Sequence, residues 1–236
     1  MNESLMVLSA HAADYVWRSG GVIAKRAMAG GKVLVVALSF GERGESSDLW
    51  KQEKKVDEIK RIRKEESENA ANCLGVQIMF LDWGDYPLRI DEQRLMELVK
   101  IIREFQPGVI ITHSEKDPFN ADHETTAKAV HTSSILSITR GVLPEMPVCR
   151  QMRLFGFEHH QPELSEFYPD VLVDITDVYD KKKKAMECFQ TQKHLINYYE
   201  NRAAMRGNHA RRISGNDSCQ YAEAFKRYYP LVGDLS

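Results

Sequence analysis

Two pairs of histidine and aspartate stand at the ends of apolar or strand-like segments. His11 and Asp14 lie three residues apart after the apolar run Met6–Leu8, and Asp122 and His123 are neighbours that open a later helix-like stretch. A chain that leaves a buried strand and turns into a helix can direct residues i and i+3 toward one point. Imidazole nitrogens and carboxylate oxygens are common zinc ligands, and three protein ligands leave a coordination position for water or substrate. The spacing therefore indicates a metal site.

Each pair taken alone also fits an ordinary structural role. His11 can be a hydrogen-bonded core histidine, and Asp14 can cap the N-terminus of a helix. Two such pairs, each after a strand-like run, shift the balance toward a metal site and leave the structural alternative open.

The elements that must position these residues follow from the alternation of short apolar runs with longer segments of helical period. This alternation predicts a single α/β domain over residues 1–236, a Rossmann-like three-layer fold with a largely parallel sheet flanked by helices. Strands are expected at Leu5–Ser9, Val33–Leu38, Val76–Leu81, Val109–Thr112, Arg153–Glu158 and Val171–Asp174, and helices at about 14–29, 51–74, 91–105, 123–138, 178–205 and 221–228. Open α/β sheets bind ligands beyond the carboxyl ends of their strands, where His11 is expected to lie.

Composition excludes several classes of function. The chain of 236 residues is 43% hydrophobic, enough to bury a full core, and its net charge of −2 without a dominant basic patch does not support nucleic-acid binding. No apolar run approaches the roughly 20 residues that a membrane helix needs, and no signal peptide is recognised. The cysteines show no CxxC spacing, which argues against a disulfide framework; they are Cys73, Cys149, Cys188 and Cys219. We therefore expect a cytoplasmic protein that acts on a small molecule.

Three stretches of the sequence resemble the zinc-dependent de-N-acetylase family named for PIG-L and LmbE, and the resemblance covers nearly the whole chain. They read Ala-His-Ala-Ala-Asp at 10–14, Asp-His at 122–123 and Tyr-Ala-Glu-Ala-Phe at 221–225. The family's opening motif is typically Ala-His-Pro-Asp-Asp, and its first histidine, its last aspartate and a later histidine bind zinc. The resemblance implies an LmbE-like fold and one zinc ion, or another divalent metal, held by His11, Asp14 and His123.

Two departures from the family pattern bear on the reaction. Ala13 stands where the deacetylases carry their general base, and a methyl group cannot take a proton from water. Asn120 stands where some family hydrolases have a histidine that stabilises the oxyanion. Both departures argue against hydrolysis of an N-acetyl group.

A narrower resemblance points to another reaction. The stretches 9–21, 38–46 and 84–87 are similar to the 4-oxalomesaconate hydratases of this superfamily, which act in gallate and protocatechuate breakdown. The resemblance implies a lyase that adds water to the carbon–carbon double bond of a tricarboxylate, giving 4-carboxy-4-hydroxy-2-oxoadipate, and a homo-oligomer. Two alternatives remain: a de-N-acetylase of an N-acetylated amino sugar with a relocated base, and a zinc-holding binding protein without turnover.

Hydration needs an activated water and an acid that protonates the neighbouring carbon. Glu45, on a glycine-flanked loop after the second expected strand, is our first candidate for acid–base work, because its carboxylate could replace what Ala13 lost. His159 and His160 follow another expected strand, and adjacent residues on a strand point to opposite faces. We choose His160 as the second acid–base group. The alternative for Glu45 is an exposed loop residue, and for the other histidine a structural role.

A substrate with three carboxylates also needs cations. The guanidinium of arginine matches a carboxylate with two parallel hydrogen bonds. Arg43 and Arg89 lie on loops expected at the same rim as His11, so we predict that they bind the substrate. Taken singly, each also fits a solvated surface charge.

Overall fold

The computed structural model describes residues 3–232 and contains a seven-stranded sheet in the order β3-β2-β1-β4-β5-β7-β6. The strands are β1 Leu5–Ser9, β2 Val33–Ala37, β3 Gln77–Phe80, β4 Val109–His113, β5 Arg153–Phe157, β6 Val171–Asp174 and β7 Ala222–Arg227. Strands β1 to β5 pair in parallel, whereas β7 runs antiparallel to both β5 and β6. The prediction of a largely parallel sheet in an α/β fold is confirmed.

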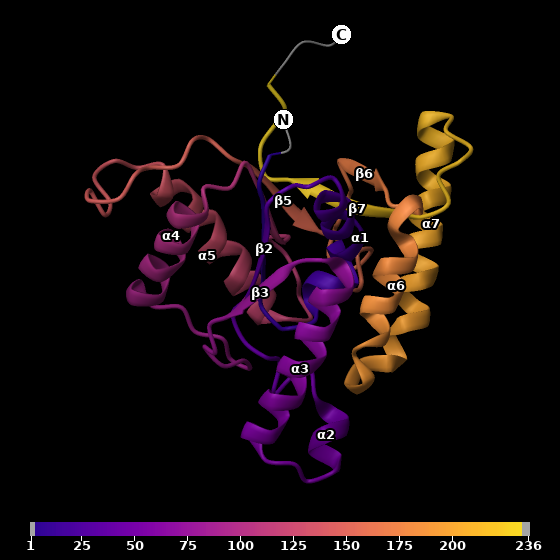
Figure 1. The fold of residues 1–236 in the computed structure, drawn as a ribbon, viewed down its shortest axis with the longest axis horizontal. Helices are drawn as coiled ribbons and strands as arrows, with labels where there is room; N and C mark the ends of the chain where they lie inside the picture. The colour runs from indigo at the N-terminus through magenta and orange to yellow at the C-terminus, as the bar shows by residue number, and fades with distance from the viewer. Residues whose placement is uncertain (1–2, 233–236) are drawn as a thin grey trace.

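Helices cover both faces of the sheet. They are α1 Asp14–Met28, α2 Ser47–Lys51, α3 Val56–Leu74, α4 Glu92–Phe105, α5 Ala121–Ser137, α6 Tyr179–Glu187 and α7 Ile196–Ser214, with short 3₁₀ helices η1 Thr176–Val178 and η2 Gln190–Leu195. Figure 1 shows α4 and α5 on one side of the sheet and α1, α6 and α7 on the other. Among residues 3–232, none of the helices is long and apolar enough to cross a membrane.

The central strand β1 shows why its sequence is continuously apolar. Met6 and Leu8 pack into the core under α4 and α5, whereas Leu5 and Val7 pack into the core under α1, α3 and α6. All four side chains are buried, because both faces of a parallel sheet are covered by helices. The strand is thereby held firmly up to the point where His11 follows it.

Three predicted helices differ from the structure. Residues 221–228 form the strand β7, not a helix. The helix expected over 178–205 is interrupted by η2 between α6 and α7, and the one expected over 51–74 begins at Val56, after the separate short helix α2. The interruption at η2 matters for function, because it places Gln192 and His194 at a cavity.

The strand order creates a crevice between β1 and β4. From β1 the chain proceeds outward through β2 and β3, then returns to β4 on the other side of β1 and proceeds outward in the opposite direction. At such a switch point the loops after the two central strands diverge and leave room for a ligand. His11 follows β1, and His123 lies in the first turn of the helix that follows β4.

Candidate metal centre and active site

The turn from β1 into α1 brings His11 and Asp14 together. The backbone N–H of His11 donates to Asp14 Oδ2 over 2.8 Å, and His11 Nδ1 lies 3.2 Å from the same oxygen. His11 is fully buried and Asp14 is 4% exposed. The i, i+3 spacing therefore has the geometric result expected from the sequence.

The segment after β4 brings His123 to the same place. Asn120 caps α5 by accepting a hydrogen bond from the backbone N–H of Asp122, and this cap starts the helical turn that carries His123. His123 Nε2 lies 3.6 Å from Asp14 Oδ1, whereas His11 faces the other carboxylate oxygen, Oδ2. Asp14 thus lies between two imidazoles that come from different strands.

Two ring nitrogens in this cluster have no hydrogen-bond partner within residues 3–232. They are His11 Nδ1 and His123 Nε2, both buried. A buried polar atom without a partner costs free energy, so such atoms call for an explanation. Two imidazole nitrogens and a carboxylate that converge at one point fit a divalent ion such as zinc.

The opposite nitrogens of the two rings are held by carboxylates. Asp122 Oδ2 lies 3.4 Å from His11 Nε2, and Asp117 Oδ2 lies 2.8 Å from His123 Nδ1. Asp122 is itself fixed by the backbone N–H groups of Tyr86 and Leu88, each donating over 2.8 Å. Carboxylates that bind the outer nitrogen of a metal-ligating histidine orient the ring and select its tautomer. The two acids therefore direct the inner nitrogens toward Asp14.

The electrostatics of the cluster favour a positive charge at its centre. Burial opposes protonation of His11, but Asp14, Asp122 and Glu45 outweigh it and raise the pKa of His11 to about 10. Burial likewise opposes ionisation of Asp14, but Arg18 and the surrounding histidines hold the pKa of its carboxyl well below the usual range. A cluster that attracts a proton so strongly also attracts a metal cation.

His113 is a third imidazole in the cluster, with Nε2 3.3 Å from Asp14 Oδ2. That nitrogen already accepts a hydrogen bond from the backbone N–H of Ala10 over 3.0 Å. Burial and the neighbouring His123 lower the pKa of His113, which keeps the ring neutral. His113 thus acts as an acceptor within the fold, while the inner nitrogens of His11 and His123 stay available.

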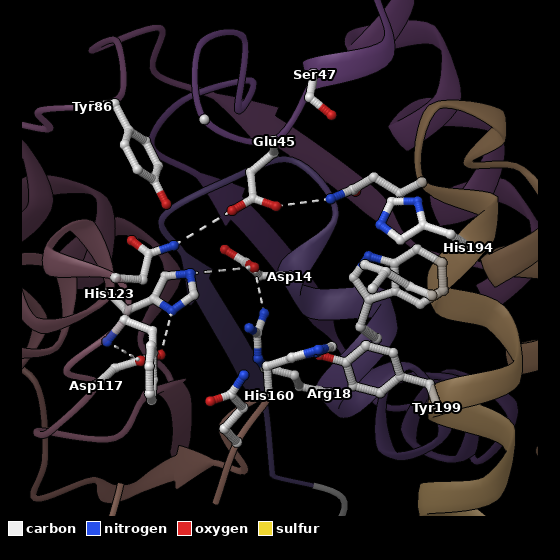
Figure 2. Close-up of a pocket in the computed structure, with 17 residues that line it drawn as sticks. Asp14, Arg18, Glu45, Ser47, Tyr86, Asp117, His123, His160, His194 and Tyr199 are labelled. Atoms are coloured by element: carbon white, nitrogen blue, oxygen red, sulfur yellow. Dashed lines mark hydrogen bonds and ion pairs between the residues drawn. The ribbon is translucent and has the colours of Figure 1, made fainter. Parts of the chain in front are cut away.

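A cavity of about 270 Å³ opens over this cluster (Figure 2). Its lining residues come from α1, the first turn of α5, η2, α7 and the loops after several strands; they include Asp14, Trp17, Arg18, Gly44, Glu45, Tyr86, Asp117, Asn120, His123, His160, Gln192, His194 and Tyr199. The cavity therefore joins the candidate metal centre to solvent.

Glu45 lies at the cavity, as the sequence predicts. One of its oxygens is 3.8 Å from His11 Nδ1. Asn120 Nδ2 donates to that oxygen over 3.4 Å, and Gln192 Nε2 donates to the other over 2.8 Å. In Figure 2 the Glu45 carboxylate points toward Asp14. Glu45 is thus oriented toward the candidate metal centre.

The two histidines after β5 separate as the prediction requires. His160 lines the cavity, with its ring stacked on Tyr198 at 4.2 Å and Nδ1 3.4 Å from the hydroxyl of Tyr199. His159 is buried and its Nδ1 lies 3.1 Å from Asp117 Oδ2, so it supports the carboxylate that orients His123. Burial, then Arg18, lowers the pKa of His160.

The structure does not bring Arg43 and Arg89 to the cavity. Both are exposed and neither is among its lining residues. Arg43 instead binds Asp85 through its backbone N–H and its guanidinium, while the carbonyl of Arg89 accepts a hydrogen bond from Arg94. Both loops contribute to the cavity through Gly44, Glu45 and Tyr86, but neither arginine lines it. The cation that does line the cavity is Arg18, which pairs with Asp14.

Sequence reasoning also missed Asp117 and Gln192. Asp117 lies six residues before His123 in the same loop, and a carboxylate close in sequence to a candidate ligand was an available signal. Gln192 lies 147 residues from Glu45 in a segment expected to be helical, so nothing local pointed to it.

The fold and the cluster define a class of protein. The model of the PIG-L family, GlcNAc-PI de-N-acetylase, matches residues 6–134, a stretch that contains His11, Asp14 and His123. The chain belongs to this family.

Within the family, the chain is similar to a hydratase over almost its full length. It is 41% identical over 234 residues to 4-oxalmesaconate hydratase of Pseudomonas putida KT2440, covering 98% of this chain and 91% of that protein. The crystal structure of GalB, the 4-carboxy-2-hydroxymuconate hydratase of Pseudomonas putida KT2440, superposes with a TM-score of 0.96 at 40% identity, over 99% of both chains.

Deacetylases are more distant. Diacetylchitobiose deacetylase of Thermococcus kodakarensis is 26% identical over 201 residues, which cover 80% of this chain and 70% of that protein. The structure of N,N'-diacetylchitobiose deacetylase from Pyrococcus horikoshii has a TM-score of 0.80 at 23% identity, covering 95% of this chain and 83% of that one, and shares the fold.

Proposed function

We propose that the chain is a zinc-dependent hydratase that adds water to the carbon–carbon double bond of 4-oxalomesaconate, giving 4-carboxy-4-hydroxy-2-oxoadipate in gallate and protocatechuate catabolism. The observation that carries this proposal is the 41% identity to a hydratase over 98% of the chain.

His11, Asp14 and His123 would hold the zinc ion through two imidazole nitrogens and a carboxylate. The unpartnered inner nitrogens of both rings support this assignment. When bound, the ion supplies charge that polarises a substrate oxygen or lowers the pKa of a bound water.

Glu45 acts as the general base in this proposal. Its carboxylate takes a proton from water, and the oxygen of that water forms a bond to one carbon of the double bond. Glu45 is suited to this step because two amides orient it beside His11, within the cavity. Ala13, where family deacetylases carry a carboxylate, is buried and offers only a methyl group.

His160 acts as the general acid. The electron pair of the double bond moves toward the neighbouring carbon and its conjugated carboxylate, and a proton from the imidazolium completes the addition. His160 lines the same cavity as Glu45, on the loop that follows β5. Burial lowers the pKa of His160, which makes its imidazolium a stronger acid, and the bound polyanion would favour the protonated ring.

The test is a spectrophotometric assay of the purified, zinc-loaded protein with 4-oxalomesaconate, with a chelator-treated sample beside it and the product identified by mass. We expect loss of the conjugated absorbance, a gain of one water in mass, and no activity after chelation. Acetate release from an N-acetylated amino sugar, without hydration, would instead establish the de-N-acetylase alternative with Glu45 as the relocated base.

A further inference from the structure

The cavity contains few groups that can bind an anion. Its lining includes three carboxylates, on Asp14, Glu45 and Asp117. Among the lining residues within the described chain, Arg18 is the only arginine, and no lysine is present. The substrate of the proposed function carries three carboxylates, so its charge must be met by the metal centre and by Arg18.

Arg18 is built into the site by the period of helix α1. It follows Asp14 by four residues, which places the two side chains on the same face of the helix. The guanidinium donates from Nη1 to Asp14 Oδ1, and Arg18 is only 8% exposed. Within residues 3–232 this is the one hydrogen bond of the guanidinium, so Nε and Nη2 keep their donors. Neither nitrogen is among the buried side-chain atoms without a partner in residues 3–232, so these donors are accessible, and Arg18 lines the cavity.

The other arginines near the cavity are already engaged. Arg206 binds Glu158 through Nε and Nη2, and Arg202 contacts Glu158 as well. Arg63, behind the loop that carries Glu45, donates to the carbonyl of Phe40 and to Thr191. None of these three arginines lines the cavity.

We propose that Arg18 is the substrate anchor: it binds a carboxylate of the substrate through Nε and Nη2 while Nη1 remains on Asp14. This proposal rests on the proposed function for the identity of the substrate. Figure 2 shows Arg18 between Asp14 and the side of the cavity formed by His160 and Tyr199. A carboxylate held there lies next to both the metal-ligating cluster and the proposed acid, so the double bond is oriented between Glu45 and His160. The planar fork of arginine fixes the carboxylate plane, which a lysine ammonium cannot do.

The first measurement is calorimetric binding of propane-1,2,3-tricarboxylate, an unreactive tricarboxylate, to the zinc-loaded protein. Arg18→Gln should weaken binding about 10- to 100-fold, the range expected for a lost charge-assisted hydrogen bond. The matched control is Arg61→Gln, which removes the same charge from an exposed position on α3. It should leave the dissociation constant within about threefold of wild type.

Arg18→Lys separates anchoring from support of Asp14. The lysine keeps a cation beside Asp14 but lacks the fork, so we expect retained zinc, measured by elemental analysis, together with weakened tricarboxylate binding. Wild-type affinity in Arg18→Lys, or in zinc-loaded Arg18→Gln, would overturn the anchor. If the wild-type protein binds the tricarboxylate through Arg18 but does not hydrate 4-oxalomesaconate, the anchor stands and the proposed function fails.

Discussion

Asp117→Asn should lower the affinity of the protein for zinc without replacing any proposed ligand. Burial opposes ionisation of Asp117, but its hydrogen bonds to His123 and His159 hold its pKa far below the usual range, so the wild-type residue is charged at neutral pH. Its Oδ2 lies 2.8 Å from His123 Nδ1 and 3.1 Å from His159 Nδ1. Asparagine keeps the shape of the side chain but removes the negative charge. In the wild type this charge orients His123 and would make its imidazole a stronger electron-pair donor to zinc. Loss of such a partner typically costs 10- to 100-fold in metal affinity, or about 1.4–2.7 kcal/mol.

The assay is competition for zinc with a chromophoric chelator at neutral pH, with circular dichroism to verify folding. Glu124→Gln is the matched control, because Glu124, in the first turn of α5, accepts a hydrogen bond from the backbone N–H of Asp117 over 2.9 Å but orients neither histidine. We expect the control to keep wild-type zinc affinity. A folded Asp117→Asn protein that binds zinc as tightly as wild type would refute the assignment of His123 as a ligand held by Asp117.

Three further predictions concern pH, cavity shape and stability. Burial lowers the pKa of His160 below about 6.5, so kcat/KM, which reports the free enzyme, should fall as the pH rises through this range. A bound polyanion favours the imidazolium, so kcat, which reports the substrate complex, should fall only at higher pH. Profiles of kcat and kcat/KM that fall at the same pH would contradict this role. Gly44→Ala would place a methyl group 2.0 Å from the ring of Tyr86, which lines the cavity, so the ring must shift. Steady-state kinetics should then show KM raised about tenfold. Unchanged kinetics would show that the Tyr86 ring does not shape the cavity. Lys182→Met leaves the Glu223 carboxylate buried without its ion pair and should lower the free energy of unfolding, measured in urea, by about 3–5 kcal/mol. Adding Glu223→Gln to this variant should recover part of the lost stability. A Lys182→Met protein as stable as wild type would exclude a stabilising buried ion pair.

Local signals were enough to predict the parallel part of the sheet. The strands β1 and β6 were predicted with their observed bounds, and β2, β3, β4 and β5 differ from their predictions by one residue at one or both ends, because continuous apolar runs bounded by polar segments mark buried strands. The pairs His11/Asp14 and Asp122/His123 were likewise enough to expect a cluster, since parallel strands bring their carboxyl ends to one edge, whereas the choice of His11, Asp14 and His123 as ligands came from the family resemblance.

Strand β7 could not be predicted, because its stability comes from distant partners. Alanine and glutamate at 222–224 favour a helix locally, but propensity is a weak signal when tertiary pairing competes with it. The antiparallel ladders to β5 and β6 satisfy its backbone, and Glu223 accepts the N–H groups of Gly21 and Val22 in α1, about 200 residues earlier. No window along the chain contains this information.

The sequence also did not indicate in which direction the side chains on the rim point. Arg43 and Arg89 lie on loops of the predicted rim, yet a loop does not have the fixed period that makes side-chain direction readable on a helix or a strand. Arg18 had that period, one helical turn after Asp14, and so its position relative to the metal cluster could be predicted. The helix α1, not the loops, therefore contained the sequence signal for the position of a cation near the cluster.

Hydration and amide hydrolysis can share this scaffold because both need an activated water beside a centre that accepts developing negative charge. What distinguishes them is where the proton-transfer groups lie around that centre. In this chain the position next to Asp14 is a buried methyl group at Ala13, and the carboxylate near His11 is instead Glu45, which comes from the loop after β2. A base on that loop reaches water from a different side than a base at the start of α1. In the proposed function, the fold would thus fix the metal ligands through β1 and β4, and Glu45 on the loop after β2 would determine which reaction the activated water undergoes.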